Sequence, residues 1–346
     1  MSDDKKLGIG VIGGGKISET VHLPGYRENS KVDLKAICDV DEETAEEMAN
    51  QFGAESWYTD YEELLARNDI QGVSVCTPNS FHREHSVAAA ESGKHVLLEK
   101  PMAPTLEECD EIIDACEENG VKLVMGFDRR FFPEYKRVKR LIDEGVVGSI
   151  SQIRFHGGHS GPYDTWGAKT DWFNKKDEVG GGALLDLGTH YIDLLRWYVG
   201  EISSVKAVGG NLAGKSEGED NALVLLDFEE GPFGQVDASW TYSEWHEFGE
   251  IHGSKATLFL RESKDPLVVY ANEEIPEGLK GPVRPTQPVS MTESMRPNRQ
   301  KIDNFVEIII KDKEPNLTGE DGKKSVEVVK AAYKSIETGE RVDLPL

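Results

Sequence analysis

Cysteine is scarce in this sequence, and its spacing excludes two common uses of the residue. The 346 residues include four cysteines, none in a C-x-x-C motif and none grouped with histidine at zinc-binding spacing. Cys109 and Cys116 fall on one expected helix, roughly 10 Å apart along its axis, which is too far for a disulfide. We therefore expect four reduced, core-filling thiols, no metal site and a cytoplasmic protein.

Long hydrophobic runs are missing as well. No apolar stretch approaches the length of a membrane span. The first apolar run, LGIGVIG (7–13), is short and broken by glycine, which favours a first strand over a signal peptide. The sequence therefore gives no reason to expect a membrane location.

Positive charge is in deficit. Lysine and arginine number 39 against 63 acidic residues, so the formal net charge is -24. Such an excess repels phosphate backbones and anionic membrane surfaces, and we exclude both as expected partners. A chain of this length can bury a large core and form more than one domain.

Short apolar runs alternate with helical patterns over residues 1–126. Near-continuous apolar strands between helices predict a doubly wound parallel sheet, that is, a Rossmann domain of the α/β class. Thr105 and Glu108 form a capping box at the start of one helix. The expected strands are 7–13, 32–39, 72–77, 94–100 and 121–127, and the clearest helices are 41–52 and 105–120.

Residues 127–346 have a different pattern, in which strands follow one another with few helices between them. The expected strands are 149–158, 205–212, 221–228, 234–243 and 256–262. This predicts a second, α+β domain with an antiparallel or mixed sheet. The proline-rich and polar segment 272–298 is expected to be a long ordered loop, and two helices near 299–312 and 319–338 close the chain. The pattern does not decide on which domain these last helices pack.

Glycine residues mark the turn after the first expected strand. In GVIGGGKIS (10–18), Gly13, Gly15 and Ser18 occupy the positions of the G-x-G-x-x-G/A pattern. The first glycine permits a tight turn, the second lets the backbone approach a pyrophosphate, and the helix N-terminus then faces the negative charge. A plain turn is the alternative, but the place between strand and helix favours a dinucleotide contacting Gly13, Gly15, Lys16 and Ile17.

Asp39 ends the second expected strand. A carboxylate at this place can accept hydrogen bonds from both ribose hydroxyls of the adenosine and would repel a 2′-phosphate. Val40 and Asp41 follow, with no arginine. The sequence therefore favours NAD over NADP, and the alternative role of capping the next helix fits Asp41 better.

Polar residues follow two further strands at the edge where a doubly wound sheet binds its ligand. The first group, which we expect at the cofactor, is Thr77, Pro78, Asn79 and His82, whereas we interpret His85 as a surface histidine. The second group is Glu99 and Lys100, directly after the strand HVLL (95–98). A lysine there can donate to a substrate oxygen and stabilise an alkoxide-like transition state, and Glu99 can hold a neighbouring hydrogen bond. The alternative is a surface ion pair.

The stretch GGGALLDLGTHYIDLLRWYVG (180–200) predicts a helix after a glycine loop. Asp186 and His190 are four residues apart and share one helix face, which suits an oriented general base. Asp193 continues that side. Gly188 inside the helix costs about 1 kcal/mol relative to alanine, so we expect another backbone or the nicotinamide to approach it closely. A structural Asp186–His190 contact is the alternative.

Together, four stretches resemble the Gfo/Idh/MocA oxidoreductases. These are GVIGGGKIS, TPNSFHREH…ESGKHVLLEKPMA, GGGALLDLGTHYID and the tail from NFVEIIIKDKEPNLTGEDG to RVDLP. The resemblance implies a Rossmann domain (1–126) followed by a substrate-binding and oligomerisation domain (127–346) with a large open, mostly antiparallel sheet. That sheet commonly forms the oligomer interface in the family.

The resemblance also implies roles for single residues. Lys100 matches the lysine of the E-K-P motif, which binds the reacting hydroxyl, and the Lys100–Pro101 bond is expected to be cis. Asp186 and His190 match the D-x-x-x-H pair, with His190 as proton acceptor. Arg129 and Asp193 match positions that line the substrate site. Asp128 stands where the family often has an uncharged residue.

Aromatic residues in the second half suggest the kind of substrate. Trp172 and Trp245, near several polar side chains, suit a sugar or cyclitol, although an ordinary loop with packed aromatics would look the same. The sequence thus predicts an NAD(P)-dependent dehydrogenase that oxidises a secondary hydroxyl, assembled as a homodimer or homotetramer. Two alternatives stay open: an NAD-retaining enzyme that uses transient oxidation for elimination, hydrolysis or epimerisation, and a non-catalytic sensor of a sugar or nucleotide.

Overall fold

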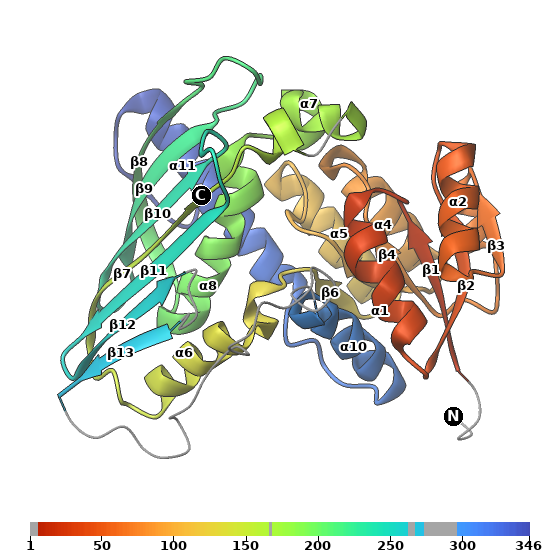
Figure 1. Cartoon of the computed structure of the whole chain (residues 1–346), viewed down its shortest axis with the longest axis horizontal. Coiled ribbons are helices and arrows are strands. Elements are labelled where there is room, and N and C mark those ends of the chain that lie inside the picture. Colours follow the sequence, from red (N-terminus) through yellow and green to blue (C-terminus); the bar gives the residue numbers. More distant parts are fainter. Residues whose placement is uncertain (1–5, 166–167, 262–266, 273–295) are drawn as a thin grey trace. The chain divides into compact units, whose positions relative to one another are not determined.

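The chain divides into two compact units (Figure 1). The computed structural model describes residues 6–165, 168–261, 267–272 and 296–346. The first unit comprises Met1–Asp128 and Met291–Lys323, and the second comprises Arg129–Ser290 and Lys324–Leu346. The loop expected at 272–298 lies almost entirely outside the described residues.

A six-stranded parallel sheet forms the first unit, as predicted. Its order places β1 in the middle, where the chain reverses direction across the sheet, and the carboxyl ends of the strands meet at one edge. The order is β3 (Ser56–Tyr58), β2 (Val32–Cys38), β1 (Leu7–Ile12), β4 (Gly72–Val75), β5 (His95–Leu98) and β6 (Leu123–Met125). The short strand β3 was not predicted.

Helices cover both faces of this sheet. One layer holds α1 (Leu23–Glu28), α2 (Glu42–Phe52) and α10 (Arg296–Ile310), and the other holds α3 (Tyr61–Leu65), α4 (His82–Glu91) and α5 (Leu106–Glu118). The predicted capping box of Thr105 and Glu108 starts α5, and Asp41 caps α2 through the backbone N–H of Thr44. Both caps satisfy N–H groups that the helix itself leaves unpaired.

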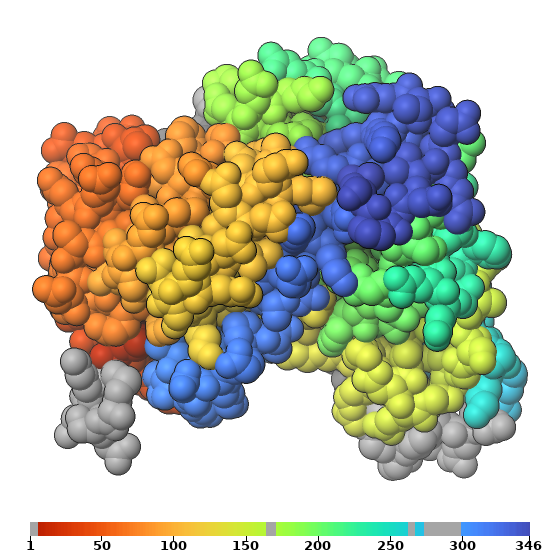
Figure 2. Space-filling view, turned by 180° about the vertical axis from the view of Figure 1, so that it is seen from behind, coloured from red at the N-terminus to blue at the C-terminus, as the bar shows by residue number. Residues whose placement is uncertain are grey.

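The helix α10 belongs to the first unit, a point that the sequence pattern left open. Ile302 packs on Gly25 of α1, and Phe305 and Ile309 pack on Gly72 of β4. In the space-filling view its blue surface lies against the orange surface of the first unit (Figure 2). The apolar stripe of α10 therefore closes one face of the first sheet, while α11 (Gly319–Thr338) continues into the second unit.

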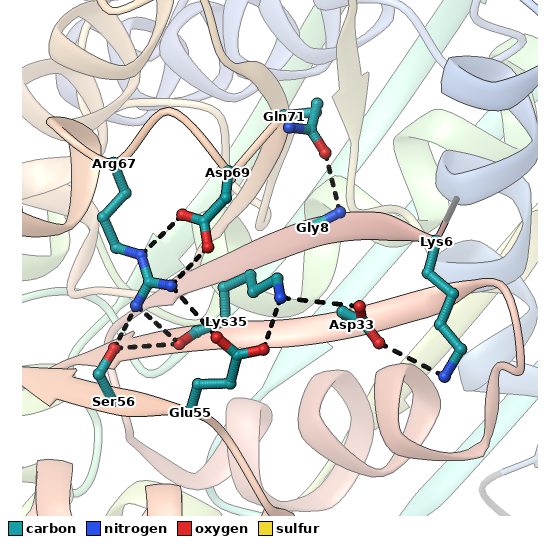
Figure 3. A network of polar contacts seen from close by, with 9 residues as sticks. All are labelled: Lys6, Gly8, Asp33, Lys35, Glu55, Ser56, Arg67, Asp69 and Gln71. Carbon is teal, nitrogen blue, oxygen red and sulfur yellow. Dashed lines mark hydrogen bonds and ion pairs between the residues drawn. The ribbon is translucent and has the colours of Figure 1, made fainter. Parts of the chain in front are cut away.

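Ion pairs join the strands near the amino end of the first sheet (Figure 3). The guanidinium of Arg67 donates to both carboxylate oxygens of Asp69, at 2.8 and 2.6 Å, and reaches Glu55 and Ser56. Lys35 pairs with Glu55 and Asp33. Pairs that are this exposed contribute roughly 0–1 kcal/mol each. The network joins β2 and β3 at the end of the sheet away from the expected ligand edge.

The second unit is built on an eight-stranded, mostly antiparallel sheet, which confirms the predicted fold class. Within it only the central strands β7 and β10 are paired in parallel. The order is β13 (Leu267–Ala271), β12 (Ala256–Arg261), β11 (His246–Gly253), β7 (Ile150–Gly158), β10 (Phe233–Ser239), β9 (Asn221–Phe228), β8 (Ile202–Gly210) and β14 (Val342–Asp343). The strands β11, β13 and β14 were not predicted.

One face of this sheet carries the core of the second unit. Side chains of α6 (Pro133–Asp143), α8 (Thr189–Val199) and α11 pack there against inward-facing residues of the strands. The opposite face carries polar and exposed apolar side chains. Alternation of side chains along each strand produces this division.

The described residues bear on disulfides, membrane-spanning helices and metal-binding clusters. All four cysteines are buried and unpaired with one another, as expected. Among the described residues, no helix is long and apolar enough to cross a membrane. In the same part of the chain, no three His, Cys, Asp or Glu side chains are grouped so as to hold a metal ion.

Candidate active site

The glycine turn after β1 has the geometry that a dinucleotide requires. Gly13 has φ +96°, and a Cβ atom there would lie 2.6 Å from the carbonyl oxygen of Cys76, so only glycine fits. A Cβ atom at Gly15 would meet nothing within 4 Å, so the backbone is open to a ligand at this point. Lys16 and Ile17 begin the helix that follows, and Lys16 is exposed and lies 3.2 Å from Glu19.

Serine in the third position of the pattern has a local partner. The next helical segment is η1 (Ser18–His22), and the Ser18 hydroxyl, which is fully buried, donates to the carbonyl oxygen of Gly13. The serine therefore fastens the start of the helix to the turn.

Asp39 lies beside this turn, at the end of β2. Its carboxylate accepts the backbone N–H of Gly14 at 2.7 Å and that of Asp41 at 3.0 Å. The next side chain is that of Val40, which is 92% exposed and carries no charge. An open glycine turn with an adjacent carboxylate fits the pyrophosphate and ribose of NAD.

The segment after β4 is held by histidine side chains. His82 is fully buried, and its ring nitrogens lie 2.9 Å from the carbonyl oxygen of Thr77 and 2.8 Å from that of Pro101. Burial lowers the pKa of His82. The ring therefore bridges the segments after β4 and β5, whereas direct contact with the cofactor stays a prediction for His82 and its neighbours Pro78 and Asn79.

His85 was expected on the surface, and that interpretation was wrong. Its ring lies 3.1 Å from the Thr77 hydroxyl and packs against Tyr61 and Phe81. Burial lowers the pKa of His85 to about 4. The residue is a neutral packing partner behind Thr77.

Glu99 and Lys100 do not form the surface ion pair considered as the alternative. Glu99 is only 5% exposed, and its Oε1 accepts from His22 at 2.7 Å and from the ammonium of Lys301. Its Oε2 lies 3.3 Å from the backbone N–H of Lys100. The Lys100 side chain is partly exposed, and the Lys100–Pro101 bond is cis, as predicted.

His22 and Lys301 were missed by the sequence analysis. Lys301 lies on the apolar face of α10, because the buried Phe305 follows four residues later on the same face. A charged residue at a buried helix position is a usable signal, because it requires a partner in the interior. His22 gave no comparable signal.

In the second unit, the glycines before the predicted catalytic helix are required by close packing. A Cβ atom at Gly181 would lie 2.2 Å from the Tyr333 hydroxyl, and one at Gly182 would lie 1.9 Å from the carbonyl oxygen of Glu219. The Glu219 carboxylate accepts the N–H of Leu184 at 2.9 Å and the hydroxyl of Tyr333 at 3.0 Å. Glu219 and Tyr333, which the sequence analysis did not select, thus fix the entry of the helix.

Asp186 and His190 lie on consecutive helical segments. Asp186 falls in η6 (Leu184–Gly188), a π-helical turn, and His190 is in the first turn of α8. Both side chains are buried, and the indole N–H of Trp240 donates to Asp186 at 3.0 Å. The close approach expected at Gly188 comes from the Leu184 side chain, 2.5 Å from a Cβ atom built there, rather than from another backbone.

The two arginines after the first unit are each held by a carboxylate. Arg129 donates to Glu247 at 3.0 Å, and Arg130 donates to both oxygens of Asp193 at 2.9 and 2.6 Å. Asp193 has no exposed surface. A contact between Asp193 and a substrate would first require this ion pair to open, so Asp193 acts in this unit as the anchor of Arg130.

The two tryptophans predicted at the substrate have different neighbours. Trp172 packs on Phe173, with ring centres 3.9 Å apart. Trp245 is 47% exposed, stacks on His159 at 4.9 Å and has the Arg129 guanidinium 5.9 Å from its ring centre. Trp245 therefore offers a flat apolar surface next to a cation.

The predicted residues thus form two sets. Those of the first unit lie at the carboxyl ends of its parallel strands: Gly13, Gly15, Lys16, Ile17, Asp39, Thr77, Pro78, Asn79, His82, Glu99 and Lys100. Those of the second unit lie on or near η6, α8 and the strand ends beside them: Arg129, Trp172, Asp186, His190, Asp193 and Trp245.

Comparison with known proteins identifies the family. Residues 7–127 match the model described as the oxidoreductase family with an NAD-binding Rossmann fold, and residues 135–259 match the GFO/IDH/MocA C-terminal domain. Myo-inositol 2-dehydrogenase of Thermotoga maritima is 30% identical over 97% of this chain and 98% of its own length. The scyllo-inositol 2-dehydrogenase (NAD(+)) of Bacillus subtilis is 31% identical over 87% of this chain and 85% of its own.

A solved structure agrees with the sequence relatives. The WlbA dehydrogenase from Bordetella pertussis, in complex with NADH and UDP-GlcNAcA, superposes with a TM-score of 0.89 at 27% identity, over 99% of each chain. The chain described above therefore belongs to the Gfo/Idh/MocA family of oxidoreductases, and its first unit contains the NAD-binding Rossmann fold of that family.

Proposed function

We propose that this protein is an NAD-dependent dehydrogenase that oxidises a secondary hydroxyl of a sugar, sugar derivative or cyclitol. The observation that carries the proposal is the acid–base set of Lys100, Asp186 and His190, present in a chain that is related over 97% of its length to a named inositol dehydrogenase. Lys100 follows a buried strand, and Asp186 is held by Trp240 one helical turn before His190.

Each residue of this set has a distinct task in the proposed reaction. The Lys100 ammonium donates to the reacting oxygen and stabilises negative charge on it. His190 accepts the hydroxyl proton, and Asp186 orients the imidazole. NAD, when bound, accepts the hydride that leaves the substrate carbon. Asp39 binds the adenosine ribose and disfavours the 2′-phosphate of NADP.

The second unit supplies the proposed substrate contacts. The exposed indole of Trp245 suits the apolar C–H face of a sugar ring, and Arg129 beside it suits oxygen atoms at the ring edge. Trp172 is proposed to contribute a further aromatic face. Relatives and neighbours that are named for inositols or determined with a sugar nucleotide agree with this substrate class.

A substrate panel tests the proposal. Inositols and sugars are incubated with NAD or NADP, and the absorbance of reduced cofactor is followed. We expect reduction with at least one compound and faster reduction of NAD than of NADP. Tightly retained nicotinamide with no release of NADH would contradict the simple dehydrogenase and favour the NAD-retaining alternative, and a flat result without bound nicotinamide would favour a sensor.

Single substitutions test the assigned roles. Lys100→Ala and His190→Ala should each lower turnover by about 10²–10⁴-fold, because each removes a group that acts in the transition state. Lys334→Ala on the exposed side of α11 is the matched control and should leave turnover unchanged. Near-normal turnover of either site variant would refute that assignment.

We further propose a homodimer or homotetramer that associates through the outer face of the second sheet. Three exposed apolar side chains on that face, Val208, Leu225 and Phe233, are 63%, 52% and 66% exposed. Monomeric proteins rarely expose large apolar patches. Light scattering should give more than one chain per particle, and a single chain would refute the assembly.

A further inference from the structure

A lysine is buried in the interior of the first unit. Lys301 of α10 is only 1% exposed, and its ammonium donates to the Glu99 carboxylate and lies 3.3 Å from the carbonyl oxygen of Gly126. Burial alone would lower the pKa of Lys301, but the carboxylates of Glu99 and Asp128 outweigh it, so the pKa is raised. Lys301 is therefore a buried cation with anionic partners.

The partner of Lys301 is fixed from a second side. Burial alone would raise the pKa of Glu99, but Lys301 and the hydrogen bond from His22 lower it below the usual value. The other ring nitrogen of His22 lies 2.9 Å from the Ser74 hydroxyl, which lies 2.6 Å from that of Tyr26. The network, defined as Tyr26, Ser74, His22, Glu99 and Lys301, connects the helix after the glycine turn, β4, the end of β5 and α10.

The network ends at the backbone of Lys100. Glu99 Oε1 is occupied by Lys301 and His22, which leaves Oε2 directed at the Lys100 N–H at 3.3 Å. The position of the Glu99 carboxylate therefore determines where the chain leaves β5 and where the Lys100 side chain begins. The same His22 belongs to the helix that the glycine turn opens, so the network also relates Lys100 to that turn.

Fold stability alone gives a weak reason for such a network. Replacing a buried ion pair by apolar side chains of similar volume is often neutral or stabilising, because both charges must be removed from water. A retained buried pair next to a proposed catalytic group is better explained by the geometry that it imposes.

We propose that Lys301 is a positioning residue for Lys100: by holding the Glu99 carboxylate together with His22, it sets the place of the Lys100 ammonium in the dehydrogenase site. This inference rests on the proposed function, in which Lys100 binds the reacting oxygen. It adds a residue distant in sequence that never contacts the substrate.

The first test measures Lys100 directly and needs no substrate. Competitive acetylation with peptide mass spectrometry reports the reactivity of the Lys100 amine in the full chain. In Lys301→Met this reactivity should change by about threefold or more, since the charge that holds Glu99 is lost. Lys301→Arg should restore it, and the control Lys311→Met, an exposed lysine directly after α10, should have no effect. Unchanged Lys100 reactivity in Lys301→Met would overturn the proposal.

The second test uses turnover and its pH dependence. In Lys301→Met, kcat should fall by about 10–100-fold, because a small misplacement of a catalytic group has effects of this size. The pKa of Glu99 should rise, so the loss of activity on acidification should move to higher pH. The other titratable groups near Glu99 are His22, Tyr26, Cys76 and His82, and they are the same in both proteins. A lower melting temperature with unchanged kcat and pH profile would mean a purely structural role.

Two controls separate the possible failures. If Lys301→Met does not fold, the double variant Lys301→Met/Glu99→Gln removes both buried charges together, and wild-type Lys100 reactivity in it would overturn the proposal. If Lys100→Ala retains turnover, the proposed function fails, whereas the acetylation result still decides whether Lys301 positions Lys100.

Discussion

At the scale of single residues, neighbours in sequence have opposite environments. Glu99 is buried and paired with Lys301, whereas Lys100 is partly exposed. Asp39 and Val40 show the same contrast, since the carboxylate holds the glycine turn and the valine side chain is 92% exposed. In both places a strand ends at the ligand edge of the sheet, and one side chain stays with the protein while the next is presented outward.

The residue-scale prediction concerns Asp39 and the choice of cofactor. The double variant Asp39→Ser/Val40→Arg removes the carboxylate that repels a 2′-phosphate and adds a cation where an exposed side chain already lies. We expect kcat/KM to fall about tenfold or more for NAD and to rise for NADP. Asp39→Asn is the control, because its amide oxygen can still accept the Gly14 N–H. An unchanged NAD/NADP ratio in the double variant would contradict the assigned role of Asp39.

At the scale of elements, the sequence predicted what depends on local patterns. β9 was predicted with its observed bounds, and α2, α5 and the five predicted strands of the first sheet lie within a few residues of expectation. The glycine turn was likewise foreseen from its pattern, and the cis Lys100–Pro101 bond was foreseen from the resemblance to the family. The partners of Lys301 and Glu219 could not be foreseen, since each lies on a segment more than thirty residues away and no local periodicity encodes such a contact. The place of Lys301 on an apolar helix face signals only that a buried partner is needed.

The element-scale prediction concerns the loop that opens the helix of Asp186 and His190. Burial raises the pKa of Glu219 to about 7, despite the hydrogen bonds from Leu184 and Tyr333. A folded-state pKa above the unfolded value gives a stability contribution that is present below about pH 4.5 and is lost as the pH rises through 7. Glu219→Gln removes this titration, so its free energy of unfolding should gain roughly 1–2 kcal/mol relative to wild type between pH 5 and pH 8.

Urea denaturation at the two pH values measures this difference. Glu230→Gln, on an exposed loop, is the control and should show no pH-dependent difference from wild type. A Glu219→Gln variant whose stability relative to wild type is the same at both pH values would contradict the pKa assigned to Glu219. Other titratable groups near Glu219 are the Lys176 ammonium and the hydroxyls of Tyr163 and Tyr333.

At the scale of the whole molecule, several buried or half-buried histidines share one direction of pKa shift. Burial lowers the pKa of five histidines: His22, His82, His85, His95 and His156. His95 accepts the backbone N–H of Lys122 at 2.9 Å, which occupies a ring nitrogen in its neutral form. Each of these side chains therefore holds a proton less tightly in the folded protein than in the unfolded chain, where histidine titrates near pH 6.5.

This difference predicts acid sensitivity of the whole fold. Because the unfolded state binds more protons through these groups, their contribution to stability is complete above about pH 6.5 and is lost as the pH falls below it. Glu219 acts in the opposite direction, since it is protonated in the fold up to about pH 7 and releases that proton on unfolding. The five histidines outnumber the three carboxyls whose pKa values burial raises, Glu219, Asp237 and Asp303, so the free energy of unfolding should decrease from pH 7 to pH 5.5. Calorimetry in two buffers of different ionisation enthalpy should find a net uptake of protons on unfolding in this range. Stability that is constant or rises on acidification would contradict the lowered pKa values of the histidines. His85→Gln removes one of these groups and should reduce the measured proton uptake.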